Sequence, residues 1–91
     1  MMREVDWGRT QAIAWNGRTF TCRYAVLVRD CPPPVNGESY GIRITLEETG
    51  ETAQVRDLTL CPERIRTLAD RLVRGGVTPC TLADVVEDWL L

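Results

Sequence analysis

The chain has 91 residues, a length that predicts a single domain over residues 1–91. Its 44% apolar and 26% charged residues argue against disorder, and its net charge of -2 gives no general attraction to nucleic acid or anionic membranes. All eleven cations are arginines, with no lysine and no histidine, which excludes an imidazole base, a Schiff-base amine and a P-loop lysine.

The N-terminal segment and the cysteines point to a cytoplasmic protein. Residues 1–6 carry acids where a signal peptide needs an apolar stretch, and no apolar run approaches the ~18–20 residues of a membrane span. Cys22, Cys31, Cys61 and Cys80 form no C-x-x-C pair, and no histidine is present to complete a zinc site. We therefore expect reduced thiols, no cofactor, no bound metal and no association with a membrane.

The first third of the chain predicts a β-hairpin. Apolar and polar residues alternate over residues 20–28, which is the two-residue period of a strand with one buried face. The preceding Asn16–Gly17 pair is typical of a two-residue turn, and such a turn pairs Ile13 with Phe20. The predicted buried face comprises Val5, Trp7, Ile13, Trp15, Phe20, Cys22, Tyr24, Val26 and Val28.

A second hairpin is predicted over residues 39–58. The prolines of residues 32–34 separate it from the first hairpin and are interpreted as a stiff connector. Apolar residues alternate again, and Thr49–Gly50 is the expected turn. With a two-residue turn at this place, Arg43 lies directly opposite Arg56 on the neighbouring strand.

From Pro62 the period of the apolar residues changes to 3.6, which predicts an amphipathic helix that ends at Gly75–Gly76. A second helix follows and begins after either Thr78 or Thr81 as its cap. Its acidic face, which we interpret as solvated, comprises Asp84, Glu87 and Asp88.

Together these segments predict an α+β fold of the order ββββαα. Residues 5–58 form a four-stranded antiparallel meander, and residues 59–91 form two helices. A sheet with one apolar face needs a cover, and each helix offers one apolar stripe. We therefore expect both C-terminal helices to pack on the same face of the sheet.

The other face of the sheet carries the candidate site. Arg23, Arg43 and Arg56 belong to three strands and are expected to lie together there. Guanidinium groups bind anions well, so the face is a candidate for an anion, nucleic acid or a protein partner. RNA-binding sheets usually present stacking aromatic residues, which this face lacks, and a solvated surface is therefore the simpler interpretation. The same face carries the small or apolar residues Ala12, Ala14, Ala25, Leu27 and Gly41, which favour a twofold dimer.

For catalysis the sequence offers few groups. Cys31 and Cys61 are the nucleophile candidates, and Cys61 lies near a helix N-terminus, which lowers the pKa of a thiol. Since no base lies near either residue in the sequence, we expect no enzymatic activity, with cysteine-dependent redox or transfer chemistry at Cys61 as the alternative. The expected function is a non-enzymatic protein-interaction or self-associating module. The alternative is anion or nucleic-acid binding through the arginine-bearing face.

Two segments resemble a small family of uncharacterised Firmicutes proteins that is classed as a domain of unknown function. They are Tyr-Gly-Ile-Arg-Ile at Tyr40–Ile44 and the segment Val77–Trp89, with its Asp-Val-Val-Glu-Asp-Trp ending. The resemblance extends over nearly the whole chain. It implies a compact, stand-alone cytosolic domain, and it brings no catalytic or ligand-binding residues.

Overall fold

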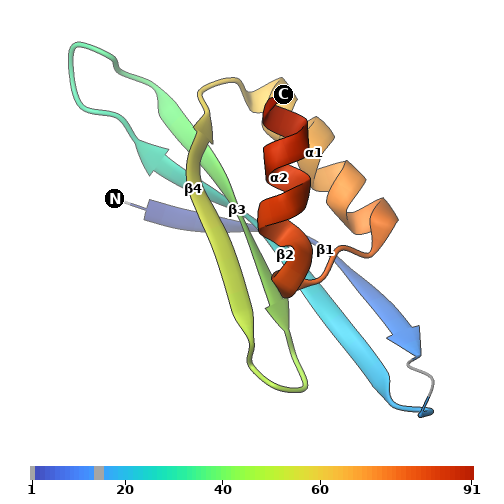
Figure 1. The fold of residues 1–91 in the computed structure, drawn as a ribbon. Coiled ribbons are helices and arrows are strands. Elements are labelled where there is room, and N and C mark those ends of the chain that lie inside the picture. Colours follow the sequence, from blue (N-terminus) through green and yellow to red (C-terminus); the bar gives the residue numbers. More distant parts are fainter. Residues whose placement is uncertain (1, 14–15) are drawn as a thin grey trace.

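The computed structural model of the protein describes residues 2–13 and 16–91 (Figure 1). Four strands form one antiparallel sheet in the order β1-β2-β3-β4, and helices follow at the C-terminal end. The strands are β1 (Met2–Ile13), β2 (Thr19–Asp30), β3 (Glu38–Leu46) and β4 (Thr52–Thr59). The helical segments are α1 (Pro62–Gly75), the short 3-10 helix η1 (Pro79–Thr81) and α2 (Leu82–Leu90). The predicted ββββαα fold is confirmed.

The helix boundaries follow the signals in the sequence. Pro62 occupies the first turn of α1, where its missing N–H is not needed. Gly76 ends the helix in the left-handed conformation at φ 59°, and Val77 N–H donates to the Leu72 carbonyl at 3.1 Å. Thr78 precedes η1 and Thr81 precedes α2, but neither hydroxyl forms a capping hydrogen bond with the helix that follows it. Within the described residues, no helix is both long and apolar enough to span a membrane.

The core lies between one face of the sheet and the two helices. Figure 1 shows α1 and α2 side by side on that face. Every second residue of β2 between Cys22 and Val28 is buried there, as the alternation predicts. Burial of a large aliphatic side chain contributes about 1.5–3 kcal/mol. The helical residues that fill the core are Ile65, Leu68, Ala69, Leu72, Leu82 and Val86.

The predicted register of the first hairpin is wrong. Near the turn the pairing is shifted by one residue, so Phe20 lies opposite Ala12 and not opposite Ile13. A bulge in β1 between Asp6 and Gly8 shifts it by one more, so Val26 lies opposite Val5 and not opposite Trp7. One extra residue in a strand moves the side chains beyond it to the other face. Ile13, predicted to be buried, is therefore 77% exposed, while Ala12 lies on the same face as Phe20. The predicted faces of Ala14 and Trp15 fall outside the described residues.

The bulge turns Trp7 toward α1. Its ring packs against the core, and its Nε1–H donates to Asp70 Oδ1 at 2.9 Å. At Gly8, the next residue, a Cβ atom would lie 3.3 Å from Val73 Cγ2, so α1 packs tightly on β1 here. The bulge thus positions the first helix on the sheet.

The predicted register of the second hairpin is also wrong. Its turn is four residues long, closed by the bond from Leu46 N–H to the Glu51 carbonyl at 2.7 Å. Arg43 consequently pairs with Gln54, and the expected pairing of Arg43 with Arg56 does not occur. The turn is held against β2, because Thr21 N–H donates to Glu48 Oε1 at 2.7 Å, a contact between residues far apart in the sequence.

The backbone of β4 approaches β3 very closely at Gly41. The pairing of these strands is irregular between Tyr40 and Ile42. A Cβ atom at Gly41 would lie 2.3 Å from the Val55 carbonyl oxygen and 2.9 Å from Arg56 Cα. No side chain fits into that space, so the position requires glycine.

We expect Gly41→Ala to lower the free energy of unfolding by about 1–3 kcal/mol, since backbone atoms of β4 must move to admit one methyl group. Urea unfolding measures the change. The matched control is Gly75→Ala, whose new Cβ would lie 3.6 Å from its nearest neighbour, Val77 Cγ2. Gly75 is helical, so this variant should be stabilised by up to about 1 kcal/mol. Equal effects of the two substitutions would contradict the close approach at Gly41.

Candidate functional site

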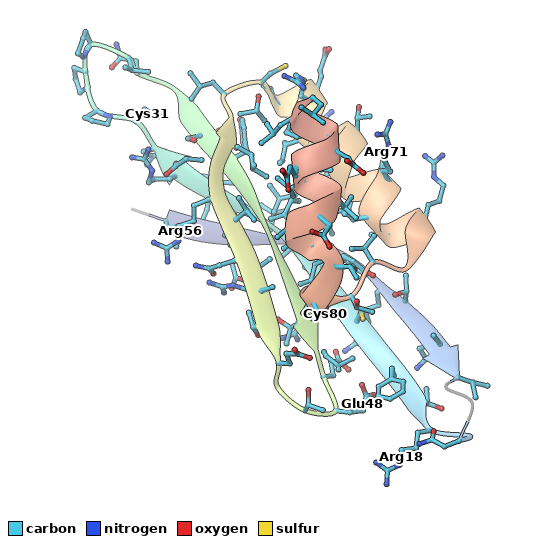
Figure 2. The ribbon with its side chains drawn as sticks, viewed as in Figure 1. Arg18, Cys31, Glu48, Arg56, Arg71 and Cys80 are labelled. Atoms are coloured by element: carbon cyan, nitrogen blue, oxygen red, sulfur yellow. The ribbon has the colours of Figure 1, made fainter. Side chains whose placement is uncertain are left out.

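The three candidate arginines lie on the face of the sheet that the helices leave uncovered, which we call the open face. Arg23 and Arg43 line one shallow groove of ≈ 320 Å³. Arg56 comes from the irregular part of β4 and points away from the helices, outside the lining of this groove (Figure 2). The structure thus brings together two of the three arginines. The open-face groove is lined by Glu4, Asp6, Arg23, Ala25, Arg43 and Thr45.

Arg43 is held by hydrogen bonds to both sides. Its Nη1 donates to Glu4 Oε1 at 2.6 Å, while Nε and Nη2 donate to Gln54 Oε1 at 2.9 and 2.7 Å. Since Glu4 belongs to β1 and Arg43 to β3, this ion pair crosses above β2, where Ala25 lies directly opposite Arg43. An exposed pair of this kind stabilises the fold by only about 0–1 kcal/mol. It nevertheless fixes the guanidinium in place.

Two further ion pairs flank the open-face groove. Arg29 Nε donates to Asp57 Oδ1 at 2.9 Å, and Arg9 Nη2 donates to Glu47 Oε1 at 2.7 Å. The hydrogen bond from Arg29 lowers the pKa of Asp57, with a further contribution from Ser39. Each of these arginines therefore already has an anionic partner within the chain, which leaves little positive potential for a bound anion.

Leu27 is buried in the middle of the open face, with 2% of its surface exposed. It lies opposite Gly41 on β3 and opposite Glu4 on β1. The absence of a side chain at Gly41 lets the β4 backbone approach on this side. The backbone of β4 and the ion pair of Glu4 with Arg43 therefore help to keep water from Leu27, and the open face is a structured surface.

A second hollow, which the sequence did not indicate, lies on the other face beneath the β1–β2 hairpin. This hairpin groove has a volume of ≈ 290 Å³. It exists because the 12-residue strands of the hairpin extend beyond the helices (Figure 1). The sequence signal that could have indicated this groove is the length of the alternating pattern, because it predicts strands longer than the helices can cover. The groove is lined by Thr10, Gln11, Ala12, Phe20, Cys22, Leu46, Glu51, Gly76, Thr78, Pro79 and Cys80.

The Tyr24 hydroxyl holds the two sides of the hairpin groove together. It donates to the Val77 carbonyl at 2.7 Å and lies 3.1 Å from the Thr10 hydroxyl. It therefore joins β1, β2 and the connection that follows α1. Burial raises the pKa of this hydroxyl, because the charged phenolate loses its hydration.

The cysteines are distributed over four places in the fold. Cys22 is buried, and burial raises the pKa of its thiol. Cys80 is exposed at the rim of the hairpin groove, where its Sγ lies 3.3 Å from the Thr78 hydroxyl (Figure 2). Cys61 precedes α1, beside Arg64, whose guanidinium lies over the Trp89 ring at 4.5 Å. In the described part of the chain, no three residues of the Cys, Asp and Glu types converge on a point where they would hold a metal ion.

The stability of the protein should fall above pH 9. The chain has no lysine, so cysteine and tyrosine are the side chains that titrate between about pH 8 and 11. The raised pKa values of Cys22, Tyr24 and Tyr40 mean that the folded state binds more protons than the unfolded chain in this range. The stabilisation is complete below the unfolded-state pKa values and is lost as the pH rises toward the folded-state values. Urea unfolding between pH 7 and 11 measures this dependence, and a constant stability would contradict it.

Tyr24→Phe isolates the contribution of the Tyr24 hydroxyl to this pH dependence. At neutral pH it should cost about 1–3 kcal/mol, because the Val77 carbonyl loses its donor, and it should reduce the alkaline decline. Tyr40→Phe is the matched control, since among the described residues the Tyr40 hydroxyl donates only to the partly exposed Glu38, at 3.2 Å. We expect a change below about 0.5 kcal/mol for that variant.

Comparison with known proteins identifies the chain by family. A family model described as a family of unknown function, DUF6514, matches residues 5–91. No curated protein and no solved structure matches the chain. The match extends over almost the entire sequence and confirms the expected membership of a domain of unknown function. The chain is a member of DUF6514, a family of unknown function.

Proposed function

We propose that this protein is a non-enzymatic interaction module that takes an apolar, extended segment of a partner protein into the hairpin groove. The observation that carries the proposal is the composition of that groove. Its lining is mainly apolar, and Glu51 is its one carboxylate among residues that include no cation. A phosphate or another anion would lose hydration there without meeting a positive charge, whereas an apolar side chain would be stabilised by burial.

The size of the groove favours a protein segment over a small molecule. Pockets for drug-sized ligands and cofactors have volumes of roughly 300–1,000 Å³. The hairpin groove, at ≈ 290 Å³, lies at the lower end of that range and is open on one side. One or two inserted side chains match this volume.

The neighbouring edge of the sheet supplies the main-chain contacts. Within the described residues β1 pairs with β2 alone, so its outer edge presents backbone groups to solvent beside the groove. Thr10 and Ala12 of this edge strand line the groove. An extended segment that adds to β1 gains backbone hydrogen bonds and inserts alternate side chains into the groove.

The non-enzymatic part of the proposal rests on the available groups. Histidine and lysine are absent from the chain. Burial raises the pKa of the Cys22 thiol, which keeps it protonated and unreactive at neutral pH. All four cysteines are free thiols, and a reducing compartment such as the cytoplasm suits them.

Anion or nucleic-acid binding through Arg23, Arg43 and Arg56 is the weaker alternative. Arg43 is bound to Glu4 and Gln54, and Arg56 lies outside the open-face groove. Glu4 and Asp6 line the same groove and would repel a phosphate.

To test the proposal, phage-displayed random peptides of about a dozen residues are selected for binding to the folded protein. The affinity of the best peptide, made synthetically, is then measured by calorimetry. Ala12→Trp fills the groove with an indole, and we expect it to weaken binding at least tenfold, about 1.4 kcal/mol. Cys80→Trp fills the groove from its opposite wall and should have the same effect.

The matched control is Arg71→Trp, which places the same indole on the exposed side of α1 (Figure 2). It should bind the peptide as the wild type does. Failure to select any saturable peptide, or equal binding by Ala12→Trp and Cys80→Trp, would contradict the proposal.

A further inference from the structure

The open face carries a second interaction surface, separate from the hairpin groove. We infer that two copies of this chain associate through their open faces, with Asp6 of each copy against Arg23 of the other. The inference goes beyond the proposed function, because it concerns the opposite face of the sheet and a different partner, a second copy of the chain.

The charges of the open-face groove are matched except for one pair. Glu4 and Arg43 neutralise each other at 2.6 Å. Asp6 and Arg23 line the same groove from adjacent strands, and neither forms an ion pair with another of the described residues. One anion and one cation of the groove therefore remain available to a partner.

A surface with one available anion and one available cation is complementary to itself. A twofold axis through the open-face groove brings residue i of one copy to residue j of the other, and residue j to residue i. Asp6 lies directly opposite Ala25 of β2, and Arg23 precedes Ala25 by two residues on that strand. An axis that passes close to Ala25 therefore forms two equivalent contacts between Asp6 and Arg23, one on each side.

The floor of the open-face groove permits close contact. Ala25, which lines it, has only a methyl side chain. Thr45, two residues beyond Arg43 on β3, adds a short polar side chain. The longer side chains around this floor are largely fixed by their ion pairs, so little conformational entropy is lost when a second copy covers them.

Overall charge favours a second copy over a polyanion. The open face is nearly neutral, so a nucleic acid would meet four carboxylates beside five guanidinium groups. A second copy presents the same balanced pattern and can match it. The charged residues of this face are Arg9, Arg23, Arg29, Arg43, Arg56, Glu4, Asp6, Glu47 and Asp57.

The available area predicts a weak dimer. β3 has nine residues and the sheet has four strands, so the face measures about 30 by 19 Å. Two such faces bury about 1,100 Å² in total, near the lower limit for specific interfaces. Association should therefore depend on concentration in the micromolar range and weaken as salt screens the charges.

A cycle of charge-reversal variants tests the inference. Sedimentation equilibrium measures the mass of each variant at concentrations from about 10 µM to 1 mM. The mass of the wild type should rise from that of one chain toward that of two. Asp6→Arg places two arginines at each contact, and Arg23→Asp places two carboxylates there. Each should weaken the dimer at least tenfold, whereas the double variant, which restores opposite charges, should recover most of the wild-type affinity.

The controls are Asp84→Arg and Arg71→Asp on the helices, which change the net charge by the same amounts and should leave the dimer intact. Ala12→Trp, which fills the hairpin groove, should leave it intact as well, so the two proposals fail independently. Circular dichroism establishes that each variant is folded. A wild type that stays monomeric, single reversals that dimerise normally, or a folded double variant that is not restored would each overturn the inference.

Discussion

The close approach of β4 to Gly41 is the contact on which the open face of the sheet depends. Because the Val55 carbonyl occupies the space of a side chain, β4 leaves regular pairing at this point and resumes it with Thr59 opposite Tyr40. This change positions Asp57, at a φ of 55°, to accept from Arg29. The four-residue turn that follows β3 places Gln54, and not Arg56, beside Arg43. The glycine and the turn together determine which charges of the open face are matched.

The two strands of the first hairpin contribute to two different surfaces. On the core side they extend past the helices and form the apolar hairpin groove; on the other side they carry Asp6 and Arg23. The bulge in β1 between Asp6 and Gly8 separates these roles, because it reverses the faces of the residues that follow. We propose protein partners for both surfaces, because the lining of one is mainly apolar and the charges of the other are nearly balanced.

The sequence predicted the fold because periodicity and helix boundaries are local signals. The two-residue alternation of β2, Pro62 at the start of α1 and Gly76 at its end each specify their element with nearby residues. Both registers were wrong because they depend on distant contacts. Glu48 binds the β2 backbone at Thr21, and no local pattern encodes that bond. The open-face groove was therefore expected with three arginines and contains two, and the hairpin groove was missed because its walls come from distant segments.

Amide chemical shifts over a dilution series test most directly whether this chain acts through its open face. If two copies associate there, the largest changes with concentration should lie on β2 and β3 around Ala25, Arg43 and Thr45, which line the open-face groove. Amides of α1 and α2, on the opposite side of the sheet, should remain unchanged (Figure 1). Shifts that do not depend on concentration, or changes confined to the helices, would contradict an interface on this face.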